Sequence, residues 1–107
     1  MIKLYTSPTP NGRKISILLE ELNVEYETIL IDLGKKEQFE KEFSKLSPTN
    51  KIPVIVDTEN SQRIFESGAI LIYLAQKYNK FLDNENYWEI MQWLILQVAY
   101  VGPMFGQ

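Results

Sequence analysis

The chain has 107 residues, a formal net charge of −3 and neither cysteine nor histidine, which excludes disulfides, thiolate nucleophiles, zinc–thiolate sites and a Ser-His-Asp triad. The acidic balance disfavours nucleic acid as a partner, no run reaches the roughly 20 apolar residues of a membrane span, and the opening MIKLYTSPTP lacks the features of a signal peptide. We therefore expect a cytoplasmic protein without a metal, whose reactive group, if it has one, arrives with a ligand.

The first half of the chain alternates between strand and helix patterns. Ile2–Thr6 predicts a strand, and an amphipathic helix begins near Asn11 or Gly12 with a stripe of Ile15, Leu18, Leu19 and Leu22. β-branched residues predict a second strand over Tyr26–Leu33, which Gly34 ends. A modest surface helix follows, with Phe39, Phe43 and Leu46 at helical spacing.

The second half continues this alternation. Ile52–Asp57 predicts a third strand with Pro53 near its start, and the polar turn TENSQ joins it as a hairpin to a short fourth strand, Arg63–Phe65. A third helix is marked by Ile70, Leu71, Leu74 and Tyr78. The order β-α-β-α-β-β-α predicts an α/β fold, in which a four-stranded mixed sheet has helices on its faces.

The last segment, Tyr87–Val101, has a different character. Its sequence YWEIMQWLILQVAYV is apolar almost all round and contains no Lys or Arg, which favours a helix buried on several sides over one on a membrane surface. We expect Gly102-Pro103 to kink or end this helix. One small domain cannot cover such a helix, so we expect further packing partners and interpret the chain as a fragment.

Three stretches make the chain similar to the cytosolic glutathione transferases: SPTPNGRKI, NKIPVIVD and FESGAILIYLAQKY. The resemblance covers essentially the whole chain, and PTPNG is most like the bacterial nu class. It implies a glutathione-binding thioredoxin-like domain at residues 1–80, and the start of an otherwise missing all-α domain at residues 84–107. A second resemblance is to the glutathione-transferase-like domain of the yeast nitrogen-regulator prion protein.

The family resemblance implies that Glu66 and Ser67 hold the γ-glutamyl end of glutathione. The residues agree with this role, because Ser67 lies where the fourth strand runs into the third helix, and a helix N-terminus favours a carboxylate. The alternative is that Ser67 is simply the helix N-cap.

The resemblance also implies a cis bond between Ile52 and Pro53, which would turn the backbone of Ile52 toward the cysteinyl part of glutathione. Lys51 could meet the glycyl carboxylate, the alternative being a solvated lysine. Gln38 matches a further glutathione contact of the family, although most polar residues of a surface helix bind nothing.

The turn after the first strand faces the sulfur of glutathione in this family. A thiol with a pKa near 8.5 is mostly protonated at neutral pH, so the site must favour the thiolate. Neutral donors at a helix N-terminus suit that task, and we predict Thr9 and Asn11 as the catalytic donors. The same residues are also good turn and N-cap formers. Ser7 is a rival donor, and Tyr5 belongs to the strand.

Two functions stay open at this point. The first is a glutathione-dependent transferase or disulfide-bond reductase that uses glutathione as cosubstrate, and the nu-class resemblance favours disulfide reduction. The alternative is a non-catalytic binding or regulatory domain with the same fold. The family implies a homodimer, and a second substrate, an unknown electrophile or disulfide, bound largely by the missing helical domain.

Overall fold

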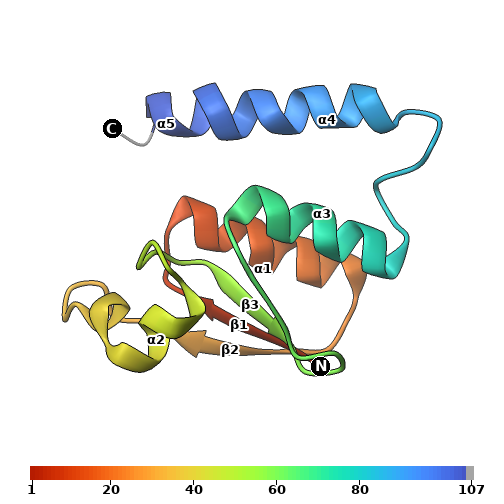
Figure 1. Cartoon of the computed structure of the whole chain (residues 1–107). Coiled ribbons are helices and arrows are strands. Elements are labelled where there is room, and N and C mark those ends of the chain that lie inside the picture. Colours follow the sequence, from red (N-terminus) through yellow and green to blue (C-terminus); the bar gives the residue numbers. More distant parts are fainter. Residues whose placement is uncertain (106–107) are drawn as a thin grey trace.

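The computed structural model describes residues 1–105, and the first part of the chain has the predicted element order (Figure 1). The elements are β1 (Ile2–Thr6), α1 (Pro10–Leu22), β2 (Tyr26–Leu30), the 3₁₀ helix η1 (Glu37–Phe39), α2 (Lys41–Leu46), β3 (Val54–Asp57), β4 (Gln62–Phe65), α3 (Ser67–Tyr78), α4 (Tyr87–Leu96), the π-helical segment η2 (Gln97–Val101) and α5 (Gly102–Phe105). Residues 106 and 107 of the predicted second unit lie outside the described residues.

The four strands form one mixed sheet in the order β2-β1-β3-β4, which confirms the predicted α/β fold. β1 runs parallel to β2, and Ile2 lies opposite Tyr26. β3 is antiparallel to both β1 and β4, so Ile2 also lies opposite Asp57. α1 joins the parallel strands β1 and β2, and a tight hairpin joins β3 to β4.

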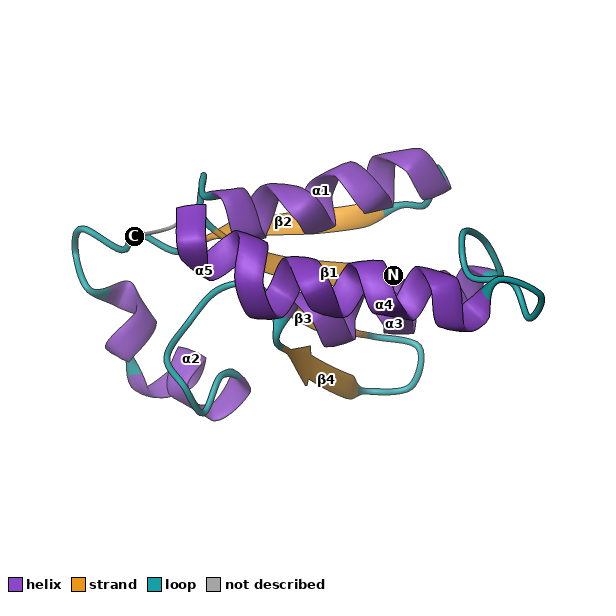
Figure 2. Cartoon of the chain, turned by 90° about the horizontal axis from the view of Figure 1, so that it is seen from above, coloured by secondary structure: helices purple, strands orange, loops and turns teal. Residues whose placement is uncertain are grey.

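The core lies between the sheet and the two long helices α1 and α3, which lie side by side over one face (Figures 1 and 2). Alternate residues of β1 point into this core. Its fully buried members are Ile2, Leu4, Ile15, Leu19, Ile55, Ile70 and Leu74. Tyr5 lies in β1, as predicted, and its ring centroid is 6.3 Å from that of Phe43 in α2. Because Tyr5 alternates with the core residues, α2 covers the opposite face of the sheet.

Several predicted boundaries were wrong by a few residues. β2 ends at Leu30 rather than Leu33, because a turn begins at Asp32. The Asp32 backbone N–H donates to the Glu37 carboxylate at 2.7 Å instead of to a neighbouring strand. Phe39 lies in η1 rather than in the predicted surface helix, since Glu40 is extended and separates η1 from α2.

The strands β3 and β4 differ from their predicted ranges at one end each. β3 begins at Val54 and not at Ile52, because Pro53 has no N–H for the ladder. β4 is one residue longer than predicted and starts at Gln62.

The C-terminal helix forms a further layer above α1 and α3 (Figure 1). Gly102-Pro103 does not end it: the Gly102 N–H donates to the Gln97 carbonyl in the π-helical pattern, and α5 continues the helix. Met91 is the one residue of α4 that is buried. The exposed apolar side chains of this layer, which we call the α4–α5 apolar face, are Trp88, Trp93, Ile95, Leu96, Tyr100, Val101 and Met104.

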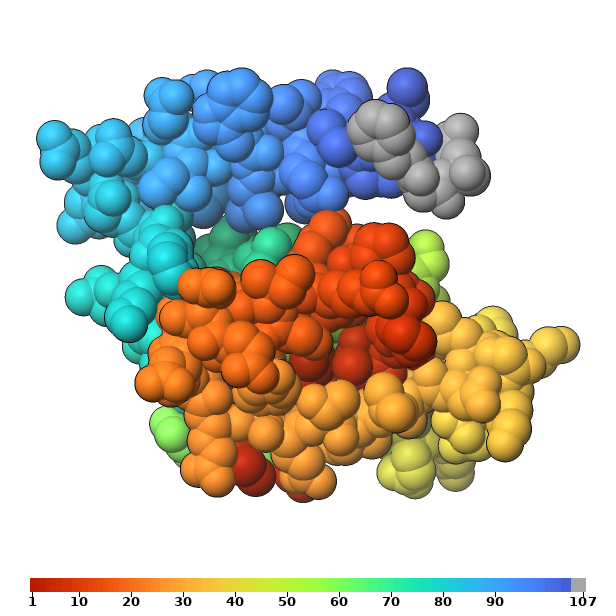
Figure 3. Space-filling model, turned by 180° about the vertical axis from the view of Figure 1, so that it is seen from behind, coloured from red at the N-terminus to blue at the C-terminus, as the bar shows by residue number. Residues whose placement is uncertain are grey.

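A small apolar cavity separates this layer from the helices beneath it. It has a volume of about 150 Å³ and is lined by Leu18, Leu71, Ile72, Ala75, Phe81, Leu82, Ile90, Met91 and Leu94. Figure 3 shows the C-terminal segment standing off from α1 on the far side of the molecule. Among residues 1–105, no helix is long and apolar enough to cross a membrane.

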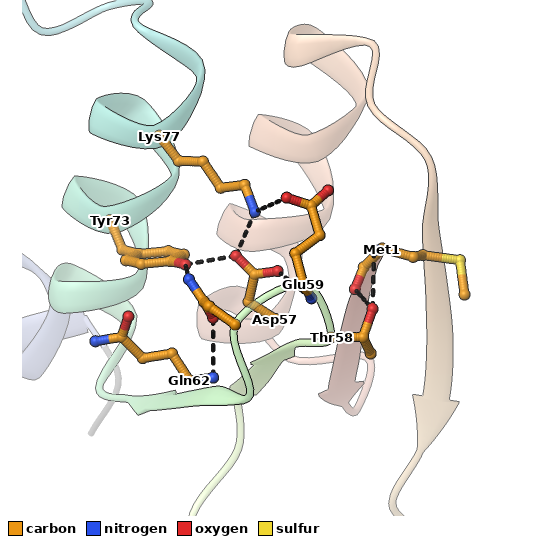
Figure 4. Close-up of polar contacts among 8 residues, drawn as sticks. Met1, Asp57, Thr58, Glu59, Gln62, Tyr73 and Lys77 are labelled. Atoms are coloured by element: carbon orange, nitrogen blue, oxygen red, sulfur yellow. Dashed lines mark hydrogen bonds and ion pairs between the residues drawn. The ribbon is translucent and has the colours of Figure 1, made fainter.

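A buried carboxylate ties the β3–β4 hairpin to α3 (Figure 4). Asp57 is fully buried at the end of β3, and its Oδ2 accepts hydrogen bonds from the Tyr73 hydroxyl at 2.5 Å and from the Lys77 ammonium. Lys77 also pairs with Glu59 of the hairpin at 2.9 Å. The N-terminal ammonium of Met1 donates to the Thr58 hydroxyl at 2.9 Å, which holds β1 to the same turn.

Candidate functional site

The turn between β1 and α1 is compact because of Gly12. A Cβ at Gly12 would come within 2.2 Å of Thr6 Oγ1 and 2.5 Å of the Ser7 carbonyl, so a side chain does not fit there. Thr9 is the N-cap of α1, and its Oγ1 accepts the Gly12 N–H at 3.2 Å. The helix begins at Pro10, slightly earlier than predicted, and this places Asn11 in its first turn with an exposed side chain.

Ser7 is buried, and its hydroxyl donates to the Ile31 carbonyl. The hydroxyl hydrogen is therefore engaged within the protein, which favours Asn11 over Ser7 as the donor to a ligand. Ser7 and Thr9 both line a neighbouring cavity of about 460 Å³, together with Leu30, Ile31 and other residues of the loop after β2.

The segment before β3 is held by a buried serine that the sequence reasoning missed. Ser47 donates its hydroxyl to the Lys51 carbonyl at 2.8 Å and accepts the Lys51 N–H at 3.0 Å. Asn50, in the left-handed region with φ 58°, donates its amide to the Gln38 carbonyl at 3.0 Å and to Ser44 Oγ at 2.6 Å. The Ile52–Pro53 bond is cis, which confirms the cis bond that the resemblance implied.

The junction of β4 and α3 supplies a helix N-terminus. Glu66 occupies the N-cap position with φ 72° and makes no side-chain capping bond, while Ser67 is the first residue of α3. The alternative that Ser67 is the N-cap was therefore wrong. The first backbone N–H groups of a helix have no partner within it, so the end of α3 offers donors and a favourable dipole to an anion.

These three segments meet around one cavity of about 520 Å³. Six of the eight predicted site residues line it: Asn11, Lys51, Ile52, Pro53, Glu66 and Ser67. The other residues of its wall are Lys14, Thr49, Val98, Gly102 and Pro103. The volume falls within the range of about 300–1,000 Å³ that is typical of small-molecule sites.

Two predicted residues lie outside this wall. Thr9 faces the neighbouring cavity, although it caps the same helix that carries Asn11. The side-chain oxygen Oε1 of Gln38 is buried and has no hydrogen-bond partner among the described residues.

Lys14 is the main residue of the site that sequence reasoning missed. Its Nζ donates to Asn11 Oδ1 at 2.8 Å and to Gln97 Oε1 at 3.0 Å, and so joins α1 to the C-terminal helix. Burial lowers the pKa of Lys14 from its ordinary value. The spacing held a signal, because residues three apart in a helix share a face and Lys14 is three residues after Asn11.

The charged side chains of the cavity wall are Lys14, Lys51 and Glu66. Among residues 1–105, no group of three or more metal-ligating side chains is present. The wall offers hydrogen-bond donors and charge: the Asn11 amide, the ammonium groups of Lys14 and Lys51, the Glu66 carboxylate and the N-terminus of α3.

The chain matches known proteins over nearly all its length. It is 50% identical to the disulfide-bond oxidoreductase YfcG of Escherichia coli, covering 100% of this chain and 53% of that protein. It is 37% identical to protein URE2 of Candida maltosa, over 92% of this chain and 33% of that protein. The chain thus spans about half the length, or less, of these curated relatives.

Solved structures agree in fold. A glutathione transferase family member from Pseudomonas fluorescens, crystallised with two glutathione bound, superposes with a TM-score of 0.93 at 47% identity, covering 99% of this chain and 49% of that one. A glutathione transferase from Pseudomonas putida with one glutathione disulfide bound per subunit has a TM-score of 0.93 at 44% identity, with the same coverage. The family model described as glutathione S-transferase, N-terminal domain, matches residues 1–76. The chain therefore belongs to the glutathione S-transferase family, of which it carries the N-terminal domain.

Proposed function

We propose that this chain is the glutathione-binding part of a glutathione-dependent transferase or disulfide-bond reductase. The observation that carries the proposal is the cavity of about 520 Å³ in which Asn11, Ile52 and Ser67 meet from three separate segments. The bound tripeptide is the cosubstrate that supplies the sulfur nucleophile, which the chain itself lacks.

Each end of glutathione has complementary groups in this cavity. The γ-glutamyl carboxylate accepts from the N-terminus of α3 at Ser67, and Glu66 pairs with the γ-glutamyl ammonium. The backbone of Ile52 pairs with the cysteinyl main chain, and Lys51 meets the glycyl carboxylate. Gln38 stays a prediction as an outer contact, since it does not line the cavity.

The reaction follows from holding the sulfur as a thiolate near Asn11, while the role of Thr9 as a second donor stays a prediction because Thr9 lines the neighbouring cavity. The thiolate displaces a leaving group from an electrophilic carbon and so forms a thioether. Alternatively it attacks a disulfide, whose S–S bond breaks with release of one thiolate, and a second thiol then attacks the resulting mixed disulfide and releases the other substrate sulfur as a thiolate. The relative named disulfide-bond oxidoreductase supports the second course for this chain. The nu-class resemblance, which stays a prediction, favours the same course.

The binding proposal is tested by titrating the chain with glutathione in a calorimeter. We expect Ser67→Ala to weaken binding by about 10-fold to 150-fold, because a hydrogen bond to a charged group contributes about 1.5–3 kcal/mol. The matched control is Ser16→Ala, since Ser16 makes only a 3.4 Å bond to the Gly12 carbonyl of its own helix. An absence of glutathione binding by the unaltered chain would contradict the function, and unchanged affinity in Ser67→Ala would remove Ser67 from the site.

A second candidate is a binding or regulatory domain that holds glutathione without activating it. The resemblance of the sequence to the glutathione-transferase-like domain of the yeast nitrogen-regulator prion protein supports this alternative. The two functions differ in the pKa of the bound thiol, which only the enzyme needs to lower. Ultraviolet absorbance of the thiolate against pH, in the complex, distinguishes them.

We also propose a division at residues 1–80 and 84–107, a cytoplasmic location and a homodimeric whole protein. The α4–α5 apolar face supports association, because Trp88, Trp93 and Tyr100 are each more than 60% exposed. Sedimentation equilibrium tests this, and a monomer at high concentration would count against the dimer.

A further inference from the structure

Lys14 holds an unusual position for a lysine. Its ammonium lies at the wall of the cavity, half-buried, and both of its described partners are neutral amide oxygens. The ion pairs found among residues 1–105 involve Lys45 and Lys77, so no described carboxylate lies within 4.0 Å of the Lys14 ammonium. Among the described residues, no carboxylate neutralises this charge, which is therefore available to a ligand in the cavity.

The same contact fixes the orientation of the Asn11 amide. An ammonium group can only donate hydrogen bonds, so the amide atom that faces Lys14 has to be the oxygen. The Asn11 NH₂ group is then the free end of the side chain, and it can donate to a ligand atom. Without Lys14 the amide could turn its carbonyl oxygen toward that atom, which would repel a thiolate.

Gln97 holds Lys14 from the other side. Its Oε1 accepts a hydrogen bond from the Lys14 ammonium at 3.0 Å. Its Nε2 would lie only 3.0 Å from a Cβ atom added at Gly102. Gly102 therefore leaves room for the Gln97 side chain. Gln97 is also the first residue of the π-helical segment, and single π turns within helices are frequent at functional sites. The contacts thus run from Gly102 through Gln97 and Lys14 to Asn11.

We propose that Lys14, held by Gln97, is a positioning residue for thiol activation: it turns the Asn11 NH₂ group toward the sulfur of glutathione and adds a positive charge that favours the thiolate. The proposal rests on the proposed function. Burial lowers the pKa of Lys14, in line with a charge kept against the cavity rather than in solvent. The other titratable groups of the wall are Lys51 and Glu66, and α4, η2 and α5 contribute none to it.

The test measures the pKa of the glutathione thiol in its complex with the full chain, from thiolate absorbance against pH, with affinity measured in parallel by calorimetry. We expect Lys14→Met to raise this pKa by about one to two pH units, because it removes a charge and frees the amide. Lys14→Arg keeps the charge and the donors and should restore most of the effect. The matched control, Lys35→Met, removes an exposed lysine outside the cavity and should change nothing.

Two further variants separate positioning from charge. Gln97→Met removes the oxygen that accepts from Lys14 but has a side chain of similar size. It therefore tests the proposal even if Lys14→Met does not fold, and we expect it to raise the thiol pKa by less than Lys14→Met does. In the Lys14→Met, Asn11→Ala double variant the rise should be smaller than the sum of the single effects, because the two residues act as one unit.

The outcomes distinguish this proposal from the proposed function. If the unaltered chain binds glutathione with a lowered thiol pKa and Lys14→Met leaves that pKa unchanged, the role of Lys14 is wrong and the function stands. An unchanged pKa in Gln97→Met would remove Gln97 from the role. If the unaltered chain binds no glutathione, the proposed function fails and the role of Lys14 fails with it.

Discussion

Asp57 provides a sharp test of what holds α3 against the sheet. It is fully buried, while Glu59, the second carboxylate on Lys77, has a side chain that is 65% exposed. Lys77 thus pairs with two carboxylates, of which Asp57 is buried and Glu59 is exposed. Asp57→Asn removes the buried charge with almost no change of shape, and Glu59→Gln does the same at the surface.

We expect the two substitutions to differ strongly in their cost. Removing one partner of a buried ion pair typically costs about 3–5 kcal/mol, and Asp57→Asn should lie near the lower value because Lys77 keeps Glu59 at 2.9 Å. An exposed pair contributes only about 0–1 kcal/mol, which is what Glu59→Gln should lose. Urea unfolding followed by circular dichroism measures both free energies. Equal losses in the two variants, or a loss below about 1 kcal/mol in Asp57→Asn, would refute this account.

The pH dependence of this difference follows from the pKa shifts. Burial, the largest influence, raises the pKa of Asp57, but the hydrogen bonds from Lys77, Tyr73 and the Glu59 backbone outweigh it and leave the pKa lowered. A group with a lowered pKa stabilises the fold above its unfolded pKa of about 3.9 and loses that contribution as pH falls through the folded value. The stability gap between the unaltered chain and Asp57→Asn should therefore narrow below about pH 4.

Lys77 acts at the other end of the pH scale. Its hydrogen bond with Asp57, the largest influence, raises the pKa of Lys77 well above its ordinary value. A raised pKa gives stability that is complete below the unfolded pKa of about 10.4 and is lost as pH rises through the folded value. Between about pH 5 and pH 9 the gap should thus be flat. A gap that widens as pH falls below about 4 would contradict the lowered pKa of Asp57, and a gap that widens as pH rises above about 10 would contradict the raised pKa of Lys77.

Two further substitutions test the turns that shape the cavity. Gly12→Ala should lower the free energy of unfolding by about 1–3 kcal/mol or more, because the new methyl group would lie 2.5 Å from the Ser7 carbonyl oxygen. Gly34→Ala should lower it far less, since its methyl group would meet only a side-chain oxygen of Asp32 at 3.3 Å, and thermal unfolding compares the two variants. Ser47→Ala should lower the free energy of unfolding by about 1–3 kcal/mol, because two hydrogen bonds to the Lys51 backbone are lost, and urea unfolding measures this. It should also weaken glutathione binding in calorimetry, whereas the control Ser16→Ala should not.

Local patterns predicted the fold well because each core element has a clear period. β1 has its predicted bounds, and the stripe of α1 supplies Ile15 and Leu19 to the core. The failures occur where a contact with a residue outside the periodic pattern decides a boundary. Glu37 ends β2 by accepting the backbone N–H of Asp32, and no periodicity within β2 contains that information.

The candidate site was predicted in part for the same reason. The backbone segments around Pro53 and Ser67 carry recognisable motifs, and they do meet at one cavity. Lys14 was missed because its significance depends on Gln97, 83 residues further along the chain. Thr9 was predicted as a catalytic donor beside Asn11, but α1 begins at Pro10, which makes Thr9 its N-cap. The Thr9 hydroxyl oxygen accepts the Gly12 N–H, so only its hydroxyl hydrogen is left to donate to a ligand.

In the complex with glutathione that we propose, the charges around the cavity allow neutral donors to suffice beside the sulfur. Two lysines and Glu66 give the wall a net charge of +1, and the N-termini of α1 and α3 each add about +0.5. Glutathione with its thiol protonated carries two carboxylates and one ammonium, a net charge of −1, and the thiolate form carries −2. The wall thus matches the thiolate better than the thiol. In this arrangement Asn11 supplies direction, while the lysines and helix ends supply the charge, so the proposed site activates a sulfur that the chain does not have to contain.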